Sequence, residues 1–176
     1  MDALQALETA LAREIKGQQS YEEAAAKTHD RKGKKLLEWL SQEETGHINL
    51  LQSAIKELKE NRQWLTRNMW GSSEYVSEPV QPSEFPSKPQ VMGNLPPDAP
   101  ELSIIEAAIE AEKADAEFYD TMAQGVEDPE GRIMLEKLAQ VEHGHQELLE
   151  EELYWIKHSK DLFTLHRFLP AGTFRA

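Results

Sequence analysis

Apolar positions recur at helical spacing along four stretches of the chain. In residues 3–28, apolar side chains stand at positions 4, 7, 11, 21 and 25, which lie on one face of a helix. The same spacing predicts helices over about 31–61, 101–125 and 129–158. Asp30 is the predicted N-cap of the second helix. Asp128, followed by Pro129 at the first helical position and by Glu130, marks the start of the fourth.

The helices form two pairs, and a proline-rich stretch over about 63–100 separates them. A connection of this length is unusual in a compact domain, but some four-helix bundles need one long crossover. We therefore predict an all-α four-helix domain over residues 1–160, made of two antiparallel helical hairpins. Residues 161–176 form a tail. Because the chain end is rich in aromatic residues, we expect it to dock on the bundle or in a dimer.

The two hairpins are copies of each other. Residues 14–51 align without gaps on residues 112–149, with fourteen identities in thirty-eight positions at an offset of 98. A fixed offset of this kind is the signature of an internal repeat. The repeat preserves three residue types that bind metals, in the pairs Glu14/Glu112, Glu44/Glu142 and His47/His145.

These six residues interrupt the apolar stripes of the four helices. Glu14 follows Leu11 on the core-facing stripe of its helix, and Glu112 follows Ile109 in the same way. On the second and fourth helices, Glu44 with His47 and Glu142 with His145 take core positions. Within each hairpin the two glutamates are equally distant from the turn. We therefore expect four glutamates and two histidines in one layer of the core.

Four buried carboxylates without counter-charges would cost several kcal/mol each. Two divalent cations would balance four negative charges, and proton sharing offers partial relief. Carboxylates with one imidazole per ion suit iron or manganese, and zinc fits by ligand type. A single Glu-x-x-His is weak evidence, but two at equal offset, each with an upstream core glutamate, match the pattern of dinuclear carboxylate bundles. The sequence therefore predicts two metal ions per chain.

Composition excludes several classes of protein. The chain has 176 residues, no cysteine and a net charge of −13. The missing cysteines rule out disulfides, zinc-thiolate sites and an iron–sulfur or rubredoxin-type centre in this chain. The acidic charge argues against a nucleic-acid partner. We find no apolar run long enough to span a membrane and no basic, apolar leader, so we expect a cytoplasmic protein.

The motifs Glu44-Thr45-Gly46-His47 and Glu142-His143-Gly144-His145, with Tyr21 and Tyr119 each seven residues after a helix glutamate, resemble the rubrerythrin group of the ferritin-like superfamily. The resemblance covers residues 3 to about 158. It implies a di-iron centre in which Glu44 and Glu142 bridge the irons, Glu14 and Glu112 are terminal, and His47 and His145 each bind one iron. Without a rubredoxin domain, the electrons must come from a separate protein such as a rubredoxin.

One residue departs from the family pattern. Rubrerythrins carry an additional glutamate one turn after the third-helix ligand, where this chain has the shorter Asp115. Asp115 is therefore a candidate catalytic residue, and a direct bond to iron is less favoured. Its repeat partner is Gly17, so the two halves of the site are expected to differ here.

Other candidate residues have weaker patterns. Tyr21 and Tyr119 lie two turns from the glutamate of their own helix, so they either pack in the core or hydrogen-bond a ligand from a facing helix. Glu43, Glu110 and His143 fall off the core stripes and are expected to face solvent. The remaining histidines and the tryptophans show no ligand pattern: His29, His158, His166, Trp39, Trp64, Trp70 and Trp155.

Three functions remain open. The first is reduction of hydrogen peroxide by a reduced di-iron centre. The second is a ferroxidase or iron-handling protein that oxidises Fe(II) with oxygen. The third is a structural bundle stabilised by its metal. We expect the first, in a homodimer.

Overall fold

The computed structural model describes residues 2–61 and 92–158. In these ranges four long helices follow one another: α1 (Ala3–Lys27), α2 (Arg31–Asn61), α3 (Glu101–Gly125) and α4 (Pro129–His158), with a short 3-10 helix η2 (Met92–Asn94) before α3. The predicted all-α four-helix bundle is confirmed. The division at residue 160 and the tail prediction lie outside the described residues. Within the described part, no helix is long and apolar enough to cross a membrane.

The helices begin where the sequence predicts. The Asp30 carboxylate accepts hydrogen bonds from the backbone N–H of Lys32 and Gly33 at 3.0 and 2.7 Å. Asp128 accepts from Glu130 and Gly131 in the same way, both at 3.0 Å. These aspartates stand at equivalent places in the repeat and satisfy N–H groups that a helix start leaves without partners. Each hairpin therefore begins its second helix with the same cap.

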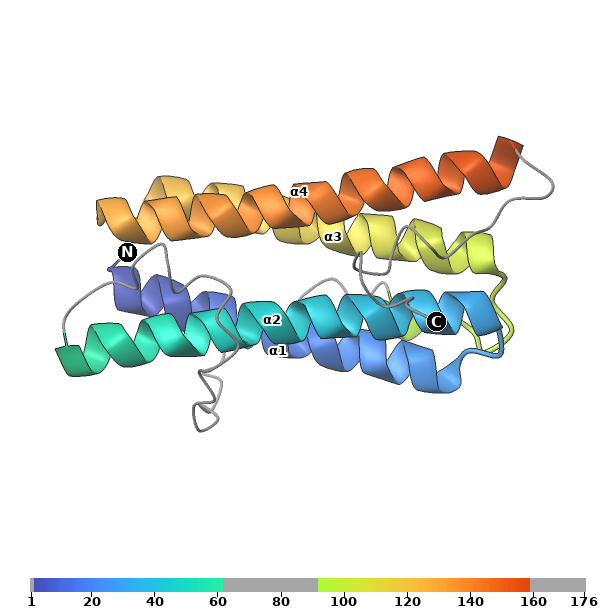
Figure 1. The fold of residues 1–176 in the computed structure, drawn as a ribbon, viewed down its shortest axis with the longest axis horizontal. Helices are drawn as coiled ribbons and strands as arrows, with labels where there is room; N and C mark the ends of the chain where they lie inside the picture. Colours follow the sequence, from blue (N-terminus) through green and yellow to red (C-terminus); the bar gives the residue numbers. More distant parts are fainter. Residues whose placement is uncertain (1, 62–91, 159–176) are drawn as a thin grey trace, which may run out of the picture.

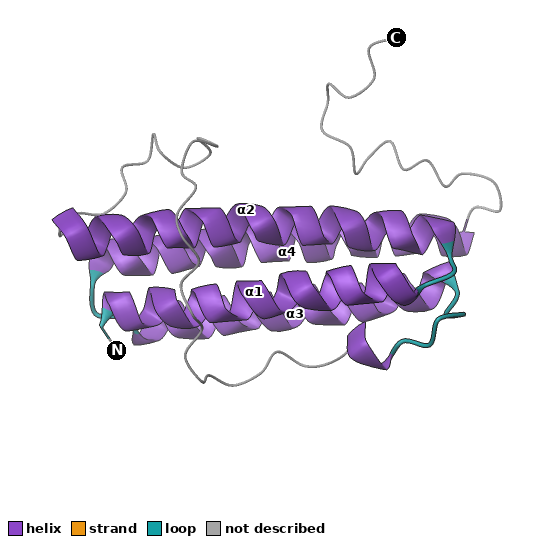
Figure 2. Ribbon diagram, turned by 90° about the horizontal axis from the view of Figure 1, so that it is seen from below, coloured by secondary structure: helices purple, strands orange, loops and turns teal. Residues whose placement is uncertain are grey.

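Each hairpin packs as an antiparallel pair, α1 with α2 and α3 with α4 (Figure 1). The two turns lie at opposite ends of the bundle, so α2 ends far from the start of α3. The connection must therefore span the length of the bundle, as the crossover prediction requires. Seen from below, α2 and α4 form one layer and α1 and α3 the other (Figure 2).

The described part of the crossover packs against the bundle. Met92 and Ala99 are buried among core residues, and the Pro97 carbonyl accepts a hydrogen bond from the His29 N–H at 2.7 Å. This contact ties the crossover to the α1–α2 turn. Residues 62–91 of the predicted crossover lie outside the described residues.

Two apolar clusters fill the core on either side of its middle. One includes Leu7, Leu11, Leu51 and Leu135, and the other includes Leu36, Leu37, Leu40, Ile104 and Leu149. Burial of each of these side chains contributes about 1.5–3 kcal/mol. The layer between the clusters holds charged side chains, which the apolar packing keeps apart from bulk water.

Candidate metal centre

Six charged side chains converge in the middle of the bundle, one glutamate from each helix and a histidine from each of α2 and α4. All are at most 9% exposed: Glu14, Glu44, His47, Glu112, Glu142 and His145. They face the core because each lies on the same face of its helix as the apolar stripe. The expected arrangement of these residues in one layer is therefore present.

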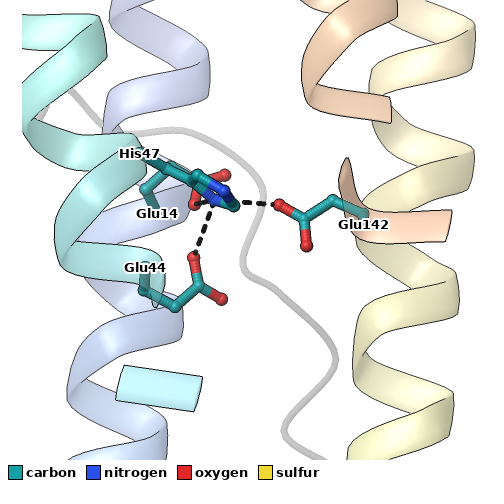
Figure 3. A group of neighbouring side chains, drawn as sticks. All are labelled: Glu14, Glu44, His47 and Glu142. Atoms are coloured by element: carbon teal, nitrogen blue, oxygen red, sulfur yellow. Dashed lines mark hydrogen bonds and ion pairs between the residues drawn. The ribbon is translucent and has the colours of Figure 1, made fainter. Parts of the chain in front are cut away.

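His47 is the centre of the first half of the cluster (Figure 3). Its Nδ1 lies 3.1 Å from Glu14 Oε2, 3.0 Å from Glu142 Oε1 and 3.8 Å from Glu44 Oε2. Glu14 and Glu44 come from the same hairpin, whereas Glu142 reaches in from α4 of the other hairpin. Thus both hairpins contribute to this half-site.

His145 occupies the equivalent place in the second half. Its Nδ1 lies 3.1 Å from Glu112 Oε2 and 3.2 Å from Glu142 Oε2. Glu142 therefore directs one oxygen to each histidine: Oε1 to His47 and Oε2 to His145. The two imidazole rings are nearly parallel, with centroids 5.8 Å apart. A carboxylate between two such nitrogens stands where a ligand shared by two cations would stand.

Two tyrosines fix the glutamates of the opposite hairpin. The Tyr21 hydroxyl donates to Glu112 Oε1, and the Tyr119 hydroxyl donates to Glu14 Oε1. Both tyrosines are buried. Of the two readings that the sequence left open, hydrogen bonding across the bundle is the one found. Each hydroxyl holds one glutamate oxygen, so that the other oxygen faces a histidine.

Asp115 also reaches the cluster, but an arginine holds it. Asp115 Oδ1 lies 2.5 Å from the Arg13 Nε, and the Arg13 Nη2 donates to the Ala114 carbonyl at 2.7 Å. The guanidinium carbon also lies 4.3 Å from the centre of the Phe118 ring. The Arg13 side chain is only 10% exposed. The sequence analysis did not identify Arg13. The feature that could have indicated it is the loss of charge in the repeat, where the position equivalent to Arg13 is Ala111.

Glu43 differs from the solvent-facing role that its stripe position predicts. Its side chain is 42% exposed, but Oε2 lies 3.8 Å from His145 Nε2. Although the residue is about 100° from Glu44 around the helix, its long side chain reaches across to α4. Glu110 and His143 are exposed as expected. Trp39, for which the sequence shows no ligand pattern, makes a T-shaped ring contact with His145, with centroids 5.5 Å apart.

Burial and mutual repulsion raise the pKa of two of the glutamates. Burial raises the pKa of Glu14 well above its ordinary value, and the nearby Glu44 adds to this effect. Burial likewise raises the pKa of Glu112 to about 8, against the opposing effect of His145. Glu142 is the exception, because its contacts with the two histidines outweigh burial and keep its pKa well below the ordinary value.

The pKa values of the two histidines shift in the direction opposite to the one that burial alone would cause. Burial alone would lower the pKa of His145, but contacts with Glu112, Glu142 and Glu43 raise it to about 11. Contacts with Glu14 and Glu142 likewise raise the pKa of His47 well above its ordinary value. In the metal-free protein, the carboxylates therefore favour the protonated form of both histidines, and burial opposes ionisation of Glu14 and Glu112.

The geometry fits metal ions in place of these protons. Three overlapping groups each offer ligand atoms within 4.8 Å of one another: Glu14 with Glu44, His47 and Glu142; Glu112 with Glu142 and His145; and Glu44 with Glu112 and Asp115. The donor set of carboxylates with an imidazole suits iron and other first-row divalent ions. The buried cluster thus has the residue types and spacing that fit a metal site.

A four-helix bundle with a carboxylate and imidazole cluster between its hairpins has the ferritin-like architecture. The family model for rubrerythrin matches residues 5–154, and the chain therefore belongs to the rubrerythrin family. A solved structure of a hypothetical protein from Pyrococcus furiosus is similar in fold, with a TM-score of 0.55 and 22% identity over 91% of this chain and 93% of that one. Among curated proteins no match was found.

Proposed function

We propose that the chain is a di-iron oxidoreductase that reduces hydrogen peroxide with electrons from a separate donor protein. The observation that carries the dinuclear part is the position of Glu142, with one oxygen toward each histidine. Membership of the rubrerythrin family supports iron as the metal.

In this proposal each half-site holds one ion. Glu14 and His47 would hold the first ion, Glu112 and His145 would hold the second, and Glu44 and Glu142 would contribute to both half-sites. Two Fe(II) ions would supply two electrons, which with two protons reduce one hydrogen peroxide to two molecules of water. Because four carboxylates balance two divalent ions, the loaded layer is close to neutral and its burial is much less costly.

The surrounding residues set the geometry that this reaction needs. Tyr21 and Tyr119 hold the two terminal glutamates from outside, so that each has one oxygen directed inward. The apolar clusters on both sides limit water and strengthen charge interactions inside the layer. The chain itself has no cysteine for an electron-carrying centre, so continued turnover requires an external donor.

Stopped-flow mixing tests the proposal directly. Metal-free protein is loaded anaerobically with Fe(II), analysed for iron, and mixed with peroxide or with oxygen. We expect two irons per chain, faster oxidation by peroxide than by oxygen, and a single oxidation when no donor is added. Faster oxidation by oxygen would favour the ferroxidase function instead. One iron or none in folded, properly loaded protein would refute the dinuclear centre.

Asp115 is proposed to assist this reaction rather than to build the site. It lies within reach of Glu44 and Glu112 but is held by Arg13. Asp115→Ala should slow the peroxide reaction and leave two irons bound. Loss of one iron in this variant would instead make Asp115 an essential ligand.

A further inference from the structure

The two histidines of the cluster differ in the contacts of their outer ring nitrogen, Nε2. His145 turns Nδ1 toward the carboxylates of the core and Nε2 toward Glu43, at 3.8 Å. His47 also turns Nδ1 toward the carboxylates, and its three ion-pair contacts with described residues all involve that nitrogen. Among the described residues, an ion-pair contact to the outer nitrogen Nε2 is therefore present at His145 and absent at His47.

The internal repeat explains this difference. The position equivalent to Glu43 is Val141, 98 residues later, and Val141 is 41% exposed on α4. The residues on either side of these two positions are the same in both copies, Gln42 with Gln140 and Glu44 with Glu142. From the repeat we infer that a side chain at position 141 faces His47 as Glu43 faces His145, but valine cannot accept a hydrogen bond.

A carboxylate behind a metal-binding imidazole has two effects. It accepts the proton on the outer nitrogen, which fixes the tautomer with the inner nitrogen free for the metal, and it makes the ring a better electron donor. It also restricts rotation of the ring. Trp39 adds to this restriction because its ring makes a T-shaped contact with the same imidazole, whereas the equivalent position carries the exposed Lys137.

We propose that Glu43 is a positioning residue for His145, and that it makes the His145 half-site the tighter of two unequal metal sites. The inference rests on the proposed dinuclear centre and adds an order of binding: the first ion enters beside Glu112 and His145, and the second beside Glu14 and His47. Glu43 does not touch the ion itself. Its partial exposure places the supporting carboxylate at the surface of the α2–α4 layer.

Titration of the metal-free protein with Co²⁺, followed by visible absorption and calorimetry, tests this order. The wild-type protein should bind two ions in two separable steps. Glu43→Ala should weaken the first step by about 10- to 100-fold, the usual effect of losing such a partner, and should leave the second unchanged. Glu43→Gln should restore part of the loss relative to Glu43→Ala, because its amide oxygen can still face the Nε2–H group as a neutral acceptor.

The repeat offers a matched control and a gain of function. Val141→Ala should leave both steps unchanged. Val141→Glu should strengthen the second step and bring the two affinities closer. The exchange variant Glu43→Val/Val141→Glu should reverse the order of binding. The first Co²⁺ ion bound by this variant should then show the absorption bands that the second ion shows in the wild-type protein.

The outcomes separate this inference from the proposed function. Fewer than two ions in the wild-type protein would refute the dinuclear centre and, with it, the unequal sites. Two ions bound by Glu43→Ala with wild-type affinities would refute the role of Glu43 alone. Equal weakening of both steps in Glu43→Ala would also refute it, since this would indicate a general loss of structure.

Discussion

The two hairpins of this bundle share their candidate metal ligands and differ in the residues that surround them. Glu14, Tyr21 and His47 repeat as Glu112, Tyr119 and His145, with equivalent contacts. The neighbours have diverged: Glu43 corresponds to Val141, Arg13 to Ala111 and Asp115 to Gly17. The repeat has therefore kept the residues that could hold ions and changed several charged residues around them. Such a site can bind two similar ions in two dissimilar environments.

The largest effect should come from the carboxylate that the two halves share. Glu142→Ala removes the oxygens facing both histidines, so we expect loss of most of both irons after anaerobic loading. Glu14→Ala should lose mainly one iron, because, among the described residues, the histidine that Glu14 contacts is His47. Elemental analysis of folded protein distinguishes the two. Retention of one full iron by Glu142→Ala would show that the halves are independent.

The next effect concerns the buried ion pair that only one half possesses. Arg13→Met removes the guanidinium from a buried Asp115, and breaking such a pair costs about 3–5 kcal/mol. We expect a loss of about 3 kcal/mol in the metal-free protein, measured by urea unfolding. Adding Asp115→Asn should recover part of it.

The surface pair Lys27–Glu23 provides the control for Arg13. Both of its side chains are more than half exposed, so Lys27→Met should change the free energy of unfolding by less than about 1 kcal/mol. If Arg13→Met were equally harmless, the Arg13–Asp115 pair would have no structural role.

Much of this arrangement follows from the sequence, and the part that does not has a physical reason. Asp30 and Asp128 fixed two helix starts, because a capping carboxylate acts on backbone groups two or three residues away. The six cluster residues were found from helical periodicity and the repeat. Glu43 and Arg13 were missed because long side chains reach partners that periodicity places on another face. A comparison of equivalent positions in the two copies of the repeat, looking for a change of charge, would have indicated both residues.

Removal of the metal should destabilise the protein by an amount that grows with pH. In the metal-free protein, the raised pKa of Glu112 stabilises the fold below its ordinary 4.5, and this contribution is lost as the pH rises to about 8. The raised pKa of His145 acts likewise from 6.5 to about 11. The lowered pKa of Glu142 acts in the opposite direction, but only below its ordinary 4.5.

Metal binding requires these ligands without their protons and becomes stronger as the pH rises. Thermal melts with and without a chelator should therefore differ by several degrees near neutrality, and by more toward about pH 8 than toward about pH 5. The gap should narrow in Glu14→Gln/Glu112→Gln protein. If the difference between the two melting temperatures decreased with rising pH, the raised pKa values in the metal-free cluster would be contradicted.

The smallest effect tests whether the conserved part of the repeat is symmetric in energy as well as in geometry. Tyr21→Phe and Tyr119→Phe each remove one hydrogen bond to a buried glutamate across the bundle. Each should cost about 1–2 kcal/mol in urea unfolding, and the two costs should agree within error. The exposed Tyr154 is the control, and Tyr154→Phe should have no effect. A markedly larger cost at one tyrosine would mean that the asymmetry of Arg13 and Asp115 extends into the ligand layer itself.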